Sequence, residues 1–124
     1  MKRILVADDN PVSRELIREI LEGDGYEVIE AGNGQEALEK LCEYSPDLAL
    51  LDIQMPILDG IALIRELRAD ARFSDLPVAA ITAYAMQGDR EKALSLGFST
   101  YITKPIDIPA FRAQVAALLG NTVE

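Results

Sequence analysis

Short strand-like runs alternate with longer segments of mixed polarity along this chain. The runs, mostly apolar, occupy residues 4–7, 26–31, 48–51, 78–81 and 100–102. In the segments that follow them, apolar residues recur at the three- and four-residue spacing of one helix face. This alternation predicts βα units built on a parallel sheet.

Five helices are expected, one after each strand. The first begins at Pro11, because Asn10 can cap it and proline suits a first helical turn. The others are expected after Asn33 and over residues 59–70, 87–96 and 108–119. For four of the helices the pattern predicts inward-facing side chains, namely Val12, Leu16, Ile17, Ile20, Leu21, Ala37, Leu38, Leu41, Cys42, Leu63, Ile64, Leu67, Ile108, Phe111, Val115 and Leu118.

The strands are apolar toward both faces, which is typical of a sheet covered by helices on both sides. Right-handed crossovers and two-sided coverage favour a doubly wound (βα)5 fold of the α/β class, with five parallel strands in the order 2-1-3-4-5. That order makes the first and third strands neighbours at the point where the winding reverses. Open α/β sheets bind their ligands at such a point.

Residues capable of chemistry stand at the carboxyl ends of four strands. Asp8 and Asp9 follow the first strand, Asp52 the third and Thr82 the fourth, while Lys104 lies just beyond the fifth. These ends share one edge of a parallel sheet, so we expect the three carboxylates to meet there. Carboxylates this close require a cation or a shared proton, and Mg²⁺ suits a set of oxygen ligands. The pattern therefore predicts a metal-assisted phosphoryl site, with a hydroxyl donor and an ammonium beside it.

The composition limits which partners and metals this site can bind and which compartment suits the protein. Among 124 residues, 21 Asp and Glu outnumber 12 Lys and Arg, and the net charge of −9 disfavours direct binding to nucleic acid. The chain has no His, so the most common general base and transition-metal ligand is missing. The lone Cys42 fits a reducing compartment. We find neither a signal peptide nor an apolar run long enough to span a bilayer, and so expect a cytoplasmic protein without membrane contact.

The ordered set of these residues resembles the receiver domain of two-component response regulators. It comprises Asp8-Asp9, the segment Asp-Ile-Gln-Met-Pro-Ile-Leu-Asp-Gly that begins at Asp52, Thr82-Ala83, and Tyr101 ahead of Lys104-Pro105. The resemblance covers nearly the whole chain, and residues 82–89 are most similar to single-domain regulators and to receivers of hybrid kinases. It implies a flavodoxin-like fold in which residues 1–124 form one receiver domain, with no effector domain.

The resemblance also implies roles for the acidic residues. Asp52 resembles the phosphoacceptor, which attacks the phosphohistidine of a sensor histidine kinase or of a histidine phosphotransfer protein. Asp9, Asp52 and the backbone carbonyl of Gln54 resemble the ligands of Mg²⁺, with Mn²⁺ as an alternative ion. Asp8 would contact the metal through a bound water. Such a domain is a signalling module that assists its own phosphorylation and dephosphorylation rather than an enzyme.

The remaining matched residues would stabilise and report the phosphoryl group. Lys104 would pair with the carboxylate before transfer and with the phosphate afterward, and Pro105 would set its direction if the bond between them is cis. Thr82 would move toward the phosphate, and Tyr101 would rotate inward into the space that it leaves. Ala83 is small enough to leave the phosphoryl group room.

The expected output is a contact with a downstream protein through the face made by the fourth helix, the fifth strand and the fifth helix. Ser99 and Thr100 stand where DNA-binding members often have acids, which argues against the salt-bridged dimer of those members. We therefore expect a monomer or a weak dimer. Gln54 and Tyr84 flank the site and would tune the lifetime of the phosphoryl group.

Three other functions fit the sequence less well than that of a phosphorylated receiver. An aspartate-based phosphatase typically carries a second Asp two residues after its nucleophile, where this chain has Gln54. A flavodoxin-like cofactor binder needs a phosphate-cradling loop after the first strand, whereas Asp8 and Asp9 would repel phosphate. A receiver that only docks partners would not need the complete set of site residues.

Overall fold

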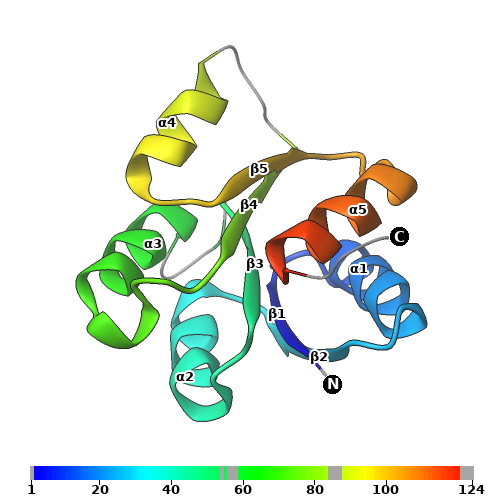
Figure 1. Ribbon diagram of the computed structural model, residues 1–124, viewed down its shortest axis with the longest axis horizontal. Helices are drawn as coiled ribbons and strands as arrows, with labels where there is room; N and C mark the ends of the chain where they lie inside the picture. The colour runs from blue at the N-terminus through cyan, green and yellow to red at the C-terminus, as the bar shows by residue number, and fades with distance from the viewer. Residues whose placement is uncertain (1, 54, 56–58, 84–87, 121–124) are drawn as a thin grey trace.

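A computed structural model describes residues 2–53, 55, 59–83 and 88–120 of the chain (Figure 1). Its elements are β1 (Arg3–Ala7), α1 (Pro11–Gly23), β2 (Glu27–Ala31), α2 (Gly34–Tyr44), β3 (Leu48–Asp52), α3 (Gly60–Ala69), the 3₁₀-helix η1 (Ala71–Phe73), β4 (Val78–Thr82), α4 (Asp89–Leu96), β5 (Thr100–Thr103) and α5 (Ile108–Leu118). The strands are all parallel and form one sheet in the order β2-β1-β3-β4-β5. The predicted doubly wound α/β fold is confirmed.

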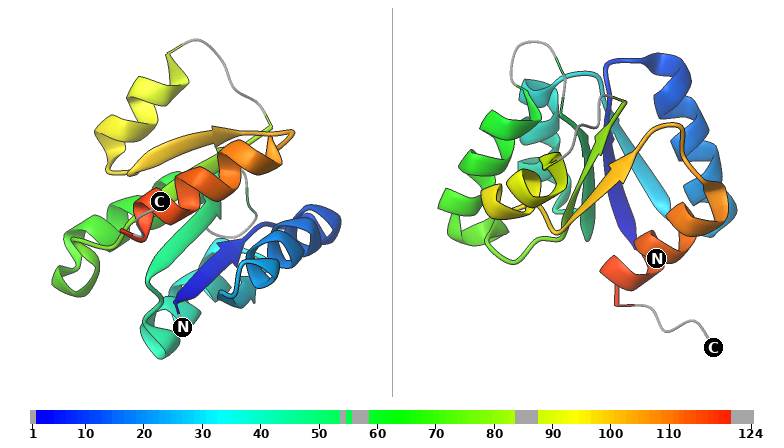
Figure 2. Two further views of the ribbon diagram at one scale, coloured as in Figure 1. Left: turned by 45° about the vertical axis from the view of Figure 1, so that its right-hand side comes forward. Right: turned by 90° about the horizontal axis from the view of Figure 1, so that it is seen from above.

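Helices cover both faces of the sheet, which explains why its central strands are apolar up to their last residues, Asp52 and Thr82. α1 and α5 lie on one face, and α2, α3 and α4 lie on the other (Figures 1 and 2). β3 and β4 are buried along their whole length. Two separate hydrophobic clusters result, one centred on Leu41, Leu63 and Ile64 and the other on Ile17, Phe111 and Val115.

Polar side chains cap the helices at the sheet edge where the predicted site lies. The Asn10 side chain accepts hydrogen bonds from the backbone N–H groups of Val12 and Ser13, as predicted. Asp59 accepts from the N–H of Ala62 at 2.8 Å. Such caps satisfy amides that have no partner within the helix and fix where each helix begins. The first residues of α1 and α3 lie next to the acidic strand ends, because the N–H of Asn10 donates to Asp8 and the N–H of Gly60 donates to the carbonyl of Ile53.

Four of the side chains predicted to face inward are exposed. Val12 and Leu16 are 75% and 46% exposed, and Cys42 is also at the surface. Each residue turns a helix by about 100°, so these three lie at least that far from their buried neighbours Ile17 and Leu41, outside the strip that the sheet covers. Ile108 is 44% exposed because it opens α5, ahead of the turns that pack on the sheet.

The hydrophobic pattern of the sequence did not predict the short 3₁₀-helix η1, which follows α3 and brings Phe73 into the core. None of the helices formed by the described residues combines the length and apolar character needed to cross a membrane.

Candidate functional site

The register of the parallel strands brings the predicted residues to one edge of the sheet. Ala7 of β1 pairs with Leu51 of β3, so Asp8 and Asp52 follow at the same level on neighbouring strands. Asp52 in turn pairs with Ile81, the residue before Thr82 on β4. This juxtaposition was expected from the strand order.

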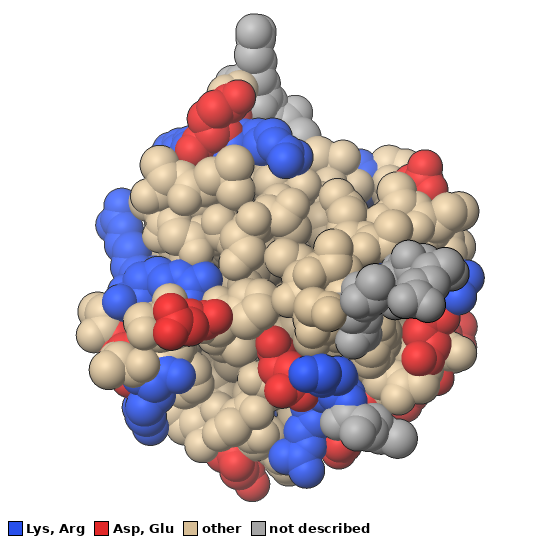
Figure 3. All heavy atoms as spheres, viewed as in Figure 1, with Lys and Arg blue, Asp and Glu red and all other residues tan. Residues whose placement is uncertain are grey.

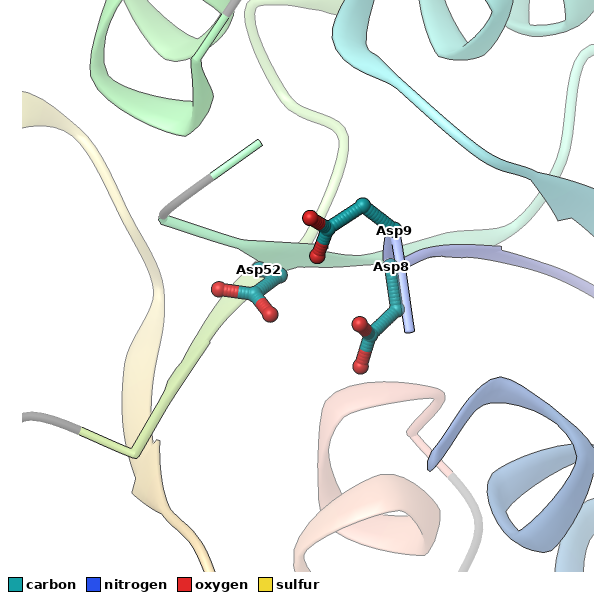
Figure 4. A group of neighbouring side chains, drawn as sticks. All are labelled: Asp8, Asp9 and Asp52. Carbon is teal, nitrogen blue, oxygen red and sulfur yellow. The ribbon is translucent and has the colours of Figure 1, made fainter. Parts of the chain in front are cut away.

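The carboxylates of Asp8, Asp9 and Asp52 form a compact cluster. One oxygen from each of the three lies within 4.8 Å of the others, and Figure 4 shows the side chains directed toward a common space. Asp8 is 1% exposed and Asp52 is 8% exposed, whereas Asp9 is open to solvent. Three hard oxygen donors, two of them sheltered, match the preference of Mg²⁺ for a few carboxylates combined with water. The donor set therefore fits the expected ion.

Lys104 supplies a positive charge to this cluster. Its Nζ donates to Asp8 Oδ2 at 2.8 Å and to Asp52 Oδ2 at 3.2 Å. Burial by itself would lower the pKa of Lys104, but the hydrogen bonds and negative charges of Asp8 and Asp52 outweigh it, so the pKa is raised and the side chain remains an ammonium. The second oxygen of Asp8 accepts from the N–H of Asn10 at 2.9 Å. Lys104 thus lies against the carboxylate expected to react.

The other residues predicted at the site lie along β4 and β5. Thr82 is 3% exposed, and its carbonyl accepts from the N–H of Lys104 at 2.8 Å. The Lys104-Pro105 peptide is cis, which sequence reasoning left open, and Ala83 is exposed next to Thr82. Gln54 and Tyr84 lie outside the described residues.

Tyr101 already points into the protein in this structure. Its side chain belongs to the cluster around Leu63 and Ile64, and the residue is only 7% exposed. Its hydroxyl has no hydrogen-bond partner in the part of the chain that the structure describes. Burial, and next the negative charge of Asp89, raises the pKa of the phenol. The inward position that was expected only after phosphorylation is therefore present here.

Sequence reasoning missed the role of Gly60 in placing Asp52. The Gly60 N–H donates to the carbonyl of Ile53 at 3.0 Å, so the start of α3 lies directly against the end of β3. A Cβ at residue 60 would be 2.8 Å from the Asp52 carbonyl oxygen and 2.9 Å from Ile53 Cα. The only signal in the sequence was a glycine immediately after the capping Asp59, which by itself does not reveal the contact.

Gly60→Ala is expected to destabilise the protein by about 1–3 kcal/mol. The added methyl group can fit only if α3 moves away from the backbone of Asp52 and Ile53. Urea unfolding followed by circular dichroism measures this loss. Gly23→Ala is the matched control, since a Cβ there meets nothing within 4 Å and the φ angle is not positive. Equal stabilities for the two variants would show that the contact between α3 and β3 is not tight.

Comparison with known proteins defines the class to which this fold and site belong. Residues 4–116 match the profile of the response regulator receiver domain. The chain therefore belongs to the family of receiver domains of two-component response regulators, and its fold is flavodoxin-like.

Among curated proteins, the chain is 39% identical over 120 residues to the polar-differentiation response regulator DivK of Brucella anthropi, covering 97% of this chain and 98% of that protein. Among solved structures, it is similar to the receiver domain of the Francisella response regulator 1452, with a TM-score of 0.90 and 30% identity over 97% of this chain and 98% of that one. It is also similar to the receiver domain of the sensor histidine kinase PA1611 from Pseudomonas aeruginosa, a structure with a magnesium ion coordinated in the active site cleft. That match has a TM-score of 0.88 and 33% identity, again over 97% and 98% of the two chains.

Proposed function

We propose that this chain is a phosphorelay receiver that accepts a phosphoryl group on Asp52, in a Mg²⁺-dependent transfer from the phosphohistidine of a sensor histidine kinase or of a histidine phosphotransfer protein. The observation that carries the proposal is the sheltered carboxylate of Asp52, which lies beside two further carboxylates and against the ammonium of Lys104. A cluster of this kind, with two of its three carboxylates buried and an excess of negative charge, is suited to a divalent cation and an incoming phosphoryl group.

Asp9 and Asp52 are the proposed direct ligands of Mg²⁺, with Asp8 acting through a bound water. The carbonyl of Gln54, outside the described residues, would complete the protein ligands. When bound, the ion neutralises charge on the carboxylates and on the phosphoryl oxygens. The magnesium ion in the related receiver of PA1611 supports this assignment. Mn²⁺, which prefers similar oxygen ligands, is an alternative.

In the proposed transfer, a carboxylate oxygen of Asp52 forms a bond to phosphorus as the bond from phosphorus to the histidine nitrogen breaks. Lys104 needs to move little, because its ammonium already contacts Asp52 and can follow the new negative charge. The hydroxyl of Thr82, at the end of the neighbouring strand, is the proposed donor to a phosphoryl oxygen. The chain thereby assists a reaction in which it is itself the acceptor. In the proposed dephosphorylation, a water oxygen forms a bond to phosphorus as the bond to the Asp52 oxygen breaks, which releases phosphate and restores the carboxylate.

The proposed output is a change in the face formed by α4, β5 and α5, to which a downstream protein binds. Tyr101 and Thr82 link this face to the site, since Tyr101 pairs with Ala80 only two residues before Thr82. α4 buries only Ala93 among its described residues, and a cavity of ≈180 Å³ lies beneath it, lined in part by Tyr101 and Thr82. A lightly packed helix over a cavity is an element that a local charge can shift between two arrangements.

Incubation with Mg²⁺ and acetyl phosphate is expected to add one phosphoryl group to the protein, detected by intact-mass spectrometry. The linkage should be base-labile, as expected of an acyl phosphate. Chelation of the divalent metal with EDTA should prevent the modification. Modification at the same rate in EDTA, or no modification at any metal concentration, would contradict the proposal.

A further inference from the structure

We infer that Arg14 is a positioning residue for the metal site, because it fixes the peptide that joins Asp8 to Asp9 and so directs Asp9 toward the ion. This inference rests on the proposed function, in which Asp9 is a ligand of Mg²⁺. Arg14 itself contacts neither the ion nor the reacting carboxylate.

The guanidinium of Arg14 reaches from the first turns of α1 back to Asp8 and Asp9, which form the acidic loop between β1 and α1. Its Nη1 donates to the backbone carbonyl of Asp8 at 2.7 Å. Its Nε donates to Glu30 Oε1 on β2 at 3.1 Å. With a side chain that is only 22% exposed, Arg14 connects the second strand of the sheet to the main chain of the site.

Glu30 holds the guanidinium in this orientation. Its second carboxylate oxygen accepts from Arg18 Nη1 at 3.0 Å, one helical turn beyond Arg14. Lys40 of α2 also donates a short hydrogen bond to the backbone carbonyl of Glu30. Glu30 is therefore fixed through both its side chain and its main chain. It holds the guanidinium of Arg14 in the orientation that donates to the carbonyl of Asp8.

The need for such a support differs between the two aspartates. The Asp8 side chain is held by Lys104 and by the N–H of Asn10. Asp9 is exposed, and its side chain forms no hydrogen bond or ion pair with residues in the described parts of the chain. The peptide before Asp9 therefore sets where its carboxylate lies, and the Arg14 hydrogen bond holds the carbonyl of that peptide. Mutation of groups that orient metal ligands in this way typically lowers metal affinity by about 10- to 100-fold.

An electrostatic role and a positioning role of Arg14 predict opposite changes in Mg²⁺ affinity when the side chain is removed. On Coulomb's law alone, loss of a positive charge near a cation site should strengthen Mg²⁺ binding. Loss of the hydrogen bond to Asp8 should weaken it, because Asp9 is no longer directed toward the site. The direction of the change thus separates a positioning role from a purely electrostatic one.

The experiment compares Arg14→Gln with Arg18→Gln by calorimetric titration of Mg²⁺ into the full chain. Both arginines pair with Glu30, but only Arg14 contacts the acidic loop. Arg14→Gln is expected to raise the Mg²⁺ dissociation constant about tenfold, and Arg18→Gln to change it less than about twofold. A second readout is the ¹⁵N chemical shift of the Asp9 amide, which reports the hydrogen bond to the preceding carbonyl and should change only in Arg14→Gln.

Tighter or unchanged Mg²⁺ binding in Arg14→Gln would overturn the inference, as would equal weakening in both variants. If Arg14→Gln does not fold, Arg14→Lys is measured instead. It keeps the charge but lacks the fork that contacts Asp8 and Glu30 together, so weakened binding supports the role and unchanged binding refutes it. Absence of Mg²⁺ binding in the unmodified protein would instead count against the proposed function itself.

Discussion

Asp52→Asn is expected to abolish phosphorylation by acetyl phosphate and by a phosphorylated histidine kinase alike. The amide has nearly the shape of the carboxylate, but it lacks the anionic oxygen that would attack phosphorus. It also removes one of the three clustered negative charges and should weaken Mg²⁺ binding. Intact-mass spectrometry after incubation with Mg²⁺ and phosphodonor measures the outcome.

The same chemical change at Asp59 provides a matched control for Asp52→Asn. Asp59 is exposed and caps α3, a role that asparagine fills about equally well. Asp59→Asn should therefore be phosphorylated at the rate of the unmodified protein. Continued labelling of Asp52→Asn at that rate would place the acceptor elsewhere.

Lys104→Met is expected to lower the free energy of unfolding by about 3 kcal/mol in the absence of divalent metal, because two sheltered carboxylates lose their shared cation. The side chains concerned are 18% exposed for Lys104, 2% for Asp8 and 11% for Asp52, so solvent screens them weakly. Urea unfolding in EDTA measures the loss. Methionine is used because it keeps most of the length of the lysine side chain.

Mg²⁺ should reverse much of this loss in Lys104→Met, because an ion that binds only the folded state stabilises it by mass action. The variant should also bind Mg²⁺ more tightly, since the competing ammonium is gone, yet accept phosphate more slowly. Lys92→Met, at an exposed lysine of α4, is the control and should change stability by less than about 0.5 kcal/mol. Unchanged stability of Lys104→Met in EDTA would show that the two ion pairs contribute nothing.

The surface charge of the folded chain bears on how partners approach. Despite the net charge of −9, acidic and basic side chains lie beside one another on the face shown in Figure 3, and its centre is largely uncharged. The field close to this face therefore changes sign from place to place, whereas the net negative charge governs the attraction of basic groups at longer range.

Sequence reasoning succeeded where one local rule decides the outcome. Asn10 and Pro11 mark a helix start because the cap involves neighbouring residues only. The apolar runs predicted a covered parallel sheet, since strands buried on both faces must be apolar throughout. The prediction that Val12, Leu16, Cys42 and Ile108 face inward was wrong. Periodicity shows that a helix has an apolar side, but not how wide a strip of the helix the sheet covers.

The order of the βα units and the identity of the residues at the strand ends follow from the amino-acid sequence, because both depend on short-range patterns and on the shared carboxyl edge of a parallel sheet. How those residues are held becomes visible only in the folded protein. The bridge of Lys104 between Asp8 and Asp52, the contact of Gly60 with Asp52 and the support of Arg14 from Glu30 each join segments brought together by folding. Such contacts depend on side-chain direction and on spacing between elements, which no local pattern records.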